Sequence, residues 1–230
     1  MTKPPPPATD IVLFDVEGSL VDCIPQTLQC WREVLARYGF EVPLAQLQRY
    51  SGMDTTDLLA ELLPATLRPR ATEIADAEAK HYREKYLPSV CAFPGVRQLF
   101  EKLKQSGCRI GLATSCQPDE LAVYLELTQI RDVIDAAACG ADAKKGKPHP
   151  DLLKVVLQRL NAAGDKTAIM VGDTPYDAQA ARALDLTALG LLTGGHSERD
   201  LRAAGCRAVY ADPAHLLARF EDAFVPQPAD

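Results

Sequence analysis

The stretch IVLFDVEGSLVD, residues 11–22, joins an apolar run to two acidic residues two positions apart. Its first four residues are all branched or aromatic, which is typical of a buried strand. Asp15 and Glu17 follow where this strand is expected to end. Two carboxyl groups at the end of a hydrophobic strand raise two questions. The first is what they do there, and the second is whether the extra methylene of Glu17 matters.

The rest of the chain supplies partners for this strand. From Phe93 onward, short apolar runs alternate with helical patterns. Further strands are expected at residues 109–115, 133–139, 167–173, 187–193 and 207–211. Strands that alternate with helices imply right-handed crossovers and a parallel sheet covered on both faces. The expected fold class is therefore α/β, with a Rossmann-like parallel sheet core.

Between Asp22 and Pro88 the pattern changes, because four helical segments follow one another without a strand signal. We interpret this block as an inserted helical-bundle cap domain beside the carboxyl edge of the sheet, where open α/β sheets bind their ligands. The expected division places residues 23–88 in the cap and residues 1–22 and 89–230 in the core. Residues 1–9, with four consecutive prolines, are expected to form an extended arm.

Composition excludes several partners. The formal net charge of −6 argues against binding to a nucleic-acid backbone, which requires a basic face. No apolar run approaches the roughly 18 to 20 residues of a membrane span, so no membrane partner is expected. Seven scattered cysteines form no C-x-x-C pair. Together with the absence of a recognisable signal peptide, this pattern favours reduced thiols and a cytoplasmic protein.

If the strands are parallel, polar residues from several loops meet at one edge of the sheet. These are Asp15 and Glu17, Thr114 and Ser115, Lys147, and Asp173 and Asp177. Each alone has a structural explanation; Asp177, for example, fits the third position of a capping box that starts at Thr174. Together they are the groups that Mg²⁺-assisted phosphoryl transfer needs: carboxylates for a hard cation, a nucleophile, an acid, a hydroxyl and a lysine.

Four motifs, FDVEGSL, GLATS, GKPHPD and VGDTPYDAQAA, occur here in an order that resembles the haloacid dehalogenase superfamily of phosphohydrolases. The resemblance extends from Ile11 to about Ala218. The helical block inserted after the first motif is similar to the C1-type cap of the β-phosphoglucomutase and phosphoglycolate phosphatase families. The resemblance implies a Mg²⁺-dependent phosphatase, monomeric or homodimeric, that hydrolyses a small phosphorylated metabolite through an aspartyl-phosphate intermediate.

Residue by residue, the resemblance also implies a metal and acid–base set. Asp15 would be the nucleophile and a metal ligand. Glu17 stands where the family has its acid/base Asp, and its backbone carbonyl would bind the metal. Asp173 would ligate Mg²⁺ directly, and Asp177 would support it through water or hydrogen bonds.

A second set would bind the phosphoryl group. Thr114 would donate a hydrogen bond to it, and Lys147 would bridge it and Asp15. Ser115 and Gly18 complete the expected phosphate- and substrate-binding residues. His149, which lies close to Lys147, is instead interpreted as a cap for the helix that begins at Pro150.

Glu17 departs from the family pattern, since a Glu carboxylate lies about one C–C bond further out than that of Asp. A displacement near 1 Å can cost on the order of 100-fold in rate. Three hypotheses remain open. The chain is a phosphatase in which Glu17 still serves as acid/base, a slowed or altered enzyme such as a phosphotransferase or mutase, or a catalytically silent metal- and phosphate-binding protein.

The cap loop SGMDTTDLL, residues 51–59, is expected to influence substrate choice. It carries Asp54 and Asp57 and no lysine or arginine. A loop that gripped a second phosphate would need basic groups. The sequence therefore favours a monophosphate with a neutral or cationic remainder over a phosphosugar mutase substrate. Alternatively, Asp54 is simply the N-cap of the next helix.

Overall fold

The computed structural model describes residues 10–224, so the expected arm at residues 1–9 lies outside the described part of the chain. Within it, six strands form one sheet in the order β5-β4-β1-β6-β7-β8, and every neighbouring pair is parallel. The strands are β1 (Ile11–Phe14), β4 (Arg109–Ala113), β5 (Ala136–Ala138), β6 (Ile169–Gly172), β7 (Thr187–Leu191) and β8 (Cys206–Tyr210). The predicted α/β fold class with a parallel sheet is confirmed.

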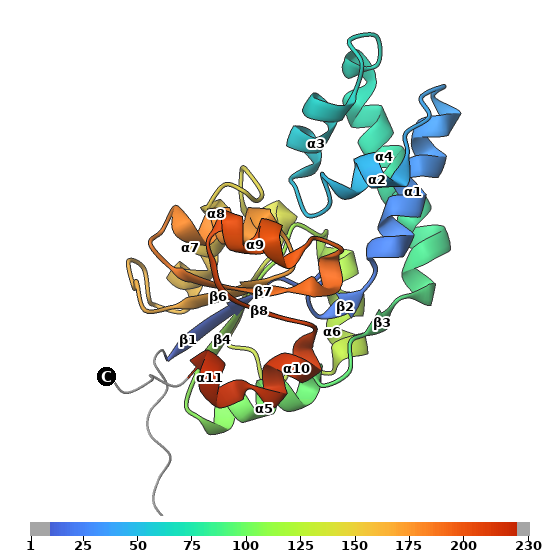
Figure 1. Cartoon of the computed structure of the whole chain (residues 1–230). Coiled ribbons are helices and arrows are strands. Elements are labelled where there is room, and N and C mark those ends of the chain that lie inside the picture. Colours follow the sequence, from blue (N-terminus) through green and yellow to red (C-terminus); the bar gives the residue numbers. More distant parts are fainter. Residues whose placement is uncertain (1–9, 225–230) are drawn as a thin grey trace, which may run out of the picture.

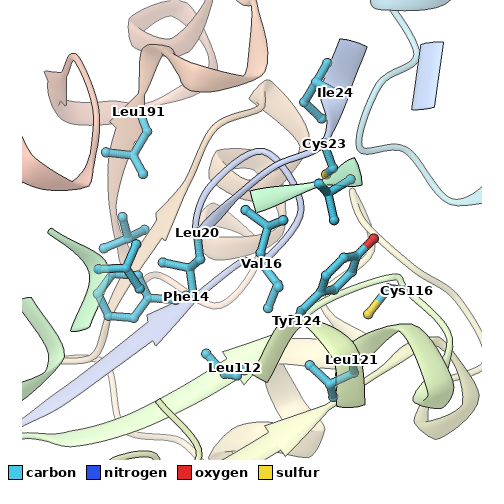
Figure 2. Packing of buried hydrophobic residues seen from close by; sticks show 14 of the residues in the cluster. Phe14, Val16, Leu20, Cys23, Ile24, Leu112, Cys116, Leu121, Tyr124 and Leu191 are labelled. Carbon is cyan, nitrogen blue, oxygen red and sulfur yellow. The ribbon is translucent and has the colours of Figure 1, made fainter. Parts of the chain in front are cut away.

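Strand β1 lies between β4 and β6, and its four side chains are fully buried. Successive side chains of a strand point to opposite faces. Val12 and Phe14 accordingly join the apolar cluster on one face of the sheet, whereas Ile11 and Leu13 join the cluster on the other. Figure 2 shows Phe14 among its packing partners. The unbroken apolar run of β1 is thus explained by helices on both sides.

The helices of this core cover the two faces of the sheet (Figure 1). The first face packs against α5 (Val96–Gln105), α6 (Pro118–Thr128), α10 (Pro213–Ala218) and α11 (Phe220–Phe224). The second packs against α7 (Asp151–Arg159), α8 (Pro175–Arg182) and α9 (Glu198–Ala204). Short 3₁₀ turns occur at Gly140–Asp142 and Leu192–Gly194. The helices α10 and α11 were not predicted from the sequence, although Asp212 caps α10 and Pro213 begins it.

A block of helices stands beside the sheet in Figure 1. It contains α1 (Ile24–Arg37), α2 (Leu44–Gln48), α3 (Thr55–Leu62) and α4 (Ala71–His81), as expected from the four helical segments. A 3₁₀ turn at Arg68–Arg70 precedes α4, a π-helical turn at Tyr82–Tyr86 extends it, and a 3₁₀ turn at Leu87–Ser89 ends it. The apolar faces of these helices continue the cluster on the first face of the sheet.

The chain crosses between sheet and helical block at two adjacent points. Strand β2 (Val21–Asp22) leads into the block and β3 (Cys91–Ala92) leads out of it. The two pair as an antiparallel ribbon, with Val21 opposite Ala92 and Asp22 opposite Cys91. This ribbon was not predicted, because two residues are too few to show the period-2 pattern of a strand.

Two further expectations concern the whole described chain. All seven cysteines are free, in agreement with the prediction of reduced thiols. None of the helices in residues 10–224 combines the length and the apolar character needed to cross a bilayer.

Candidate active site

The carboxyl ends of three neighbouring strands bring the predicted residues together. Asp15 follows β1, and its backbone N–H still donates to the carbonyl of Val171 in β6 (2.9 Å). Thr114 follows β4 in the same way, because its N–H donates to the carbonyl of Ala138 (3.1 Å). Asp173 follows β6. Each side chain therefore starts from backbone that the sheet holds in place.

Lys147 joins this edge from the loop before α7, and it is almost completely buried, with 2% of its surface exposed. Its ammonium group donates to Asp15 Oδ1 and to Asp177 Oδ1, the latter at 2.7 Å. A buried charge is tolerated only when it is paired. Although burial favours the neutral amine, the two carboxylates outweigh it and raise the pKa of Lys147. Lys147 is therefore held as a cation at this edge of the sheet, and its expected contact with a phosphoryl group stays a prediction.

Burial and the charged neighbours of Asp15 shift its pKa in opposite directions. Burial raises it, the Lys147 ammonium lowers it, and the Asp177 carboxylate raises it again, leaving a pKa of about 6. The nearby cation therefore offsets part of the desolvation penalty. At neutral pH most of the Asp15 carboxyl groups are ionised, which is the form that a nucleophile needs.

Three carboxylates meet beside this lysine. One oxygen each of Asp15, Asp173 and Asp177 lies within 4.8 Å of the others, and all three residues are buried. Asp173 Oδ1 accepts a hydrogen bond from the Ser19 hydroxyl (2.6 Å). Its Oδ2 is buried and has no hydrogen-bond partner among the described residues. Three acids with one lysine and an orphaned carboxylate oxygen fit a divalent cation with oxygen ligands.

Asp177 also has a structural role, as expected. Thr174 is the N-cap of α8, Pro175 follows it, and the Asp177 carboxylate accepts from the Thr174 N–H (3.1 Å) and hydroxyl (2.7 Å). One Asp177 oxygen accepts from Thr174 and the other from Lys147, so this carboxylate is held in place beside the other two acids. The two interpretations of this residue are compatible.

Gly18 occupies the turn that follows β1, with φ +77°, a region that favours glycine. A Cβ at this position would lie 2.4 Å from Asp173 Oδ2 and 2.9 Å from Ile24 Cδ1. Glycine is therefore required by the backbone and by the close approach of the Asp173 carboxylate. The predicted part of Gly18 in substrate binding stays a prediction.

The two predicted hydroxyl groups lie at the same edge in different settings. Thr114 is fully buried, and its hydroxyl accepts from the Cys116 N–H (3.3 Å). The Ser115 hydroxyl is buried without a partner among the described residues, and Ser115 lines the large cavity beside the site. Ser115 thus has a free donor in a position to meet a ligand.

Glu17 has a different environment from the three aspartates, and its carboxyl is not among the converging group. The Tyr124 hydroxyl donates to Glu17 Oε1 (3.1 Å). Burial, followed by the carboxylates of Glu120 and Asp15, raises the pKa of Glu17 to about 8. At neutral pH Glu17 therefore carries a proton, which is the form that a general acid needs.

A cavity of about 720 Å³ opens beside Glu17 and reaches into the helical block. The core contributes Glu17, Ser115 and Cys116 to its wall, and the block contributes apolar side chains such as Trp31 together with charged ones such as Arg83. Trp31 is nevertheless mostly buried within the block. The cavity is large enough to hold a small organic molecule next to the acidic residues.

The loop before α3 contacts the core. Asp54 is the N-cap of α3, because its carboxylate accepts from the Thr56 N–H (2.9 Å). Its other oxygen accepts from the Gly146 N–H (3.1 Å), and its own N–H donates to the Lys147 carbonyl (2.9 Å). The N-cap alternative for Asp54 is thus confirmed, and the same carboxylate also ties the block to the Lys147 loop.

The interpretation of His149 as a helix cap was wrong. Pro150 occupies the N-cap position of α7, and no side chain caps this helix. The imidazole of His149 lies 3.5 Å from the Asp57 carboxylate of α3. Because a proline already fixes the backbone at the start of α7, His149 is left to face the helical block instead.

Two residues of the site were missed by sequence reasoning. Ser19 lies fully buried in the turn after β1, and a hydroxyl within the first motif could have been recognised as a partner for an acid. Tyr124 sits at an ordinary core position of α6. No local signal distinguishes it from a packing residue, because only the folded chain places it against Glu17.

Together these elements define a class of α/β proteins in which a parallel sheet presents buried carboxylates and one lysine beneath an inserted helical block. The model of the haloacid dehalogenase-like hydrolase family matches residues 12–191. The chain belongs to this family, as its motifs indicated.

Individual relatives agree with this assignment. A phosphoglycolate phosphatase of Rhodospirillum rubrum is 28% identical over 215 residues, covering 89% of this chain and 88% of the relative. A plasmid-encoded phosphoglycolate phosphatase of Cupriavidus necator is 30% identical over 177 residues, covering 75% and 76%. The crystal structure of a hydrolase from Pseudomonas syringae superposes with a TM-score of 0.84 at 27% identity, covering 93% of this chain and 99% of that one.

Proposed function

We propose that the protein is a phosphatase that hydrolyses a small phosphorylated metabolite through an aspartyl-phosphate on Asp15. One observation carries the proposal: Asp15, held against Lys147, lies at the same strand end as Glu17, which lines the cavity and has a higher pKa than Asp15. Two carboxyl groups with different protonation states supply a nucleophile and an acid.

In the first step, an Asp15 oxygen attacks phosphorus while the bond from phosphorus to the leaving oxygen breaks. Glu17 donates its proton to that oxygen, so the product leaves as a neutral alcohol. Lys147, Thr114 and Ser115 are proposed to bind the phosphoryl oxygens. A bound Mg²⁺, held by Asp15 and Asp173 and supported by Asp177, would neutralise charge that develops on the phosphoryl group.

In the second step, the ionised Glu17 takes a proton from a water molecule that attacks phosphorus. The bond between phosphorus and Asp15 breaks, phosphate leaves, and Glu17 is protonated again. The residue therefore returns to its starting form after each turnover.

We further propose that residues 23–88 act as the cap domain that holds the non-phosphoryl part of the substrate. The wall that this block contributes to the cavity supports the proposal, as does the contact of Asp54 with Gly146. The names of the relatives make 2-phosphoglycolate the first substrate to test. The preference for a monophosphate with a neutral or cationic remainder stays a prediction from the sequence, because Asp54 caps α3 and neither Asp54 nor Asp57 lines the cavity.

The expected setting of the enzyme follows from the whole chain. We propose a cytoplasmic monomer or homodimer that does not use nucleic acid or membrane partners. The net charge of −6 and the free cysteines support this proposal.

The direct test is hydrolysis of para-nitrophenyl phosphate with Mg²⁺ and with a chelator. Metal-dependent turnover is expected, and Asp15→Asn should lower it by at least about 1,000-fold. Asp10→Asn is the matched control, since it alters an exposed acid just before β1. Turnover that is equal with Mg²⁺ and with the chelator, or that is unchanged in Asp15→Asn, would contradict the proposal. A screen of phosphorylated metabolites, including 2-phosphoglycolate, would then identify the substrate.

A further inference from the structure

Two tyrosine hydroxyls form a chain that ends on Glu17. Tyr124 of α6 is fully buried, and its hydroxyl donates to Glu17 Oε1 at 3.1 Å. The hydroxyl of Tyr82 lies 2.9 Å from that of Tyr124 and is also buried. Tyr82 belongs to the π-helical turn that extends α4, so the chain runs from the helical block through the core to Glu17.

The direction of the hydrogen bonds follows from counting protons. Each phenol has one hydrogen to donate. Since Tyr124 donates its hydrogen to Glu17, the hydrogen between the two tyrosines must come from Tyr82. Burial raises the pKa of both phenols, so both remain donors across the working pH range. Tyr82 thereby fixes the rotation of the Tyr124 O–H bond, which points it at the carboxyl group.

The ring of Tyr124 is itself held firmly. Figure 2 shows it among the apolar side chains of Val16, Leu121 and Cys116. Its hydroxyl has no freedom to follow a mobile partner, because buried aromatic rings in packed interiors stay in one rotamer. A donor on a fixed ring therefore defines one position for Glu17 Oε1.

Glu17 needs such a constraint more than an Asp would. Its side chain has one more rotatable bond, so it samples more orientations at the strand end. The carboxylates of Glu120 and Asp15 raise the pKa of Glu17, and within the described part of the chain neither forms a hydrogen bond with it. The Lys147 ammonium is already bonded to Asp15 and Asp177. The hydrogen bond from Tyr124 is thus the contact that selects one orientation.

We propose that Tyr124 is a positioning residue for Glu17, and that Tyr82 orients the Tyr124 hydroxyl from the helical block. This proposal rests on the proposed phosphatase function, in which Glu17 delivers a proton to the leaving oxygen. Among the described residues, the Tyr124 hydroxyl bonds to Glu17 and Tyr82, and no hydrogen bond to Asp15 is found. Its effect is to place the Glu17 carboxyl where proton transfer is efficient.

The test compares two substrates that depend differently on proton donation. Phenyl phosphate releases a basic phenolate and needs an acid, whereas para-nitrophenyl phosphate releases a weakly basic anion and needs it much less. Values of kcat/KM report the steps up to departure of this group. Tyr124→Phe should lower kcat/KM for phenyl phosphate about 10-fold, as expected for loss of one hydrogen bond, and for para-nitrophenyl phosphate by less than about threefold.

Three further variants separate positioning from structure. Tyr82→Phe should show the same selectivity with a smaller effect. Tyr86→Phe is the matched control, because this buried tyrosine of the same turn donates to Glu33 and should leave the ratio of the two substrates unchanged. In a Glu17→Gln background, Tyr124→Phe should have no further effect on that ratio, since no proton remains to be positioned.

Each outcome decides a different point. A wild-type chain that hydrolyses neither ester defeats the proposed function and this inference with it. A wild-type chain that is active, combined with a Tyr124→Phe variant that slows both esters equally or neither, overturns the positioning role alone. Equal thermal midpoints for Tyr124→Phe and Tyr86→Phe would exclude loss of folding as the cause of a selective effect.

Discussion

Asp15 and Glu17 leave the same strand end two residues apart, and desolvation is the largest influence on the pKa of each. Beyond that their surroundings differ. Asp15 faces the Lys147 ammonium and has a pKa of about 6, whereas Glu17 faces a neutral phenol and other carboxylates and has a pKa of about 8. The comparison shows how one lysine, placed beside one acid and hydrogen-bonded to it, gives two neighbouring carboxyl groups different pKa values, which is the difference that the proposed roles of nucleophile and proton donor require.

Removal of the lysine should have the largest effect on both stability and turnover. Lys147→Met leaves Asp15 and Asp177 buried without their cation, so the free energy of unfolding should fall by about 3–5 kcal/mol. Turnover should fall by about 100-fold or more. Denaturant unfolding with a chelator measures the first effect, and steady-state kinetics with Mg²⁺ measure the second.

The control for this change is Lys145→Met, which removes an exposed lysine two residues earlier and should alter stability by less than about 0.5 kcal/mol. Added Mg²⁺ should stabilise the Lys147→Met variant, because three acids remain to hold it. A loss of stability below about 1 kcal/mol would mean that the lysine does not offset the buried charges.

Replacement of Glu17 by an amide, which has no acidic proton, should have the next largest effect on turnover. Glu17→Gln should lower kcat/KM for phenyl phosphate about 100-fold, since general acid catalysis commonly contributes that much. In the wild type, the donating form of Glu17 is lost as the pH rises through about 8, so kcat/KM should decline above that pH. The decline should be missing in Glu17→Gln; an identical alkaline limb in both proteins would assign it to another group.

The same residue should affect stability with a defined sign. The folded-state pKa of Glu17, about 8, exceeds its usual value of 4.5, so the folded chain binds more protons between these limits. Its contribution therefore makes the protein less stable as pH rises through this window, and the loss is complete above about 8.

Glu17→Gln abolishes this loss and keeps an acceptor for Tyr124. In chelator, the thermal midpoint should rise by a few degrees at pH 9 and change little at pH 5. Glu41→Gln, at an exposed acid, serves as the control at both pH values. A midpoint that drops at pH 9 would show that the ionised carboxyl is better solvated than its surroundings suggest.

The smallest effect on the kinetics is expected from Asp54, which ties the helical block to the loop that carries Lys147. Asp54→Asn retains a good N-cap for α3 but has only one oxygen to share between the Thr56 and Gly146 N–H groups. KM should rise about two- to fivefold with little change in kcat, because the block closes less firmly over the Lys147 loop. Asp57→Asn, on the same helix, should have a smaller effect; the reverse order would assign closure to the contact with His149.

Much of this arrangement was readable in the sequence. The apolar run of β1 and the alternation after Phe93 follow from periodicity, and parallel strands then bring Asp15, Lys147 and Asp173 to one edge. The capping box at Thr174 was likewise visible, because its residues are close in sequence.

What the sequence did not reveal depends on contacts between distant segments. Tyr82 and Tyr124 look like packing residues until the fold places their hydroxyls 2.9 Å apart. The orientation of His149 toward Asp57 requires the helical block to be in place. The ribbon of β2 and β3 is too short for any pattern, and the pairing partner of each strand lies on the far side of the inserted helices.

That ribbon has an evolutionary consequence. The chain leaves the core at Asp22 and returns at Cys91, and these two residues are paired directly. No strand of the six-stranded sheet comes from the segment between them. Recombination at this point could therefore exchange one set of helices for another without altering the register of the catalytic edge. The exchanged segment would carry Tyr82 with it, so a newly acquired block would have to provide its own donor for Tyr124.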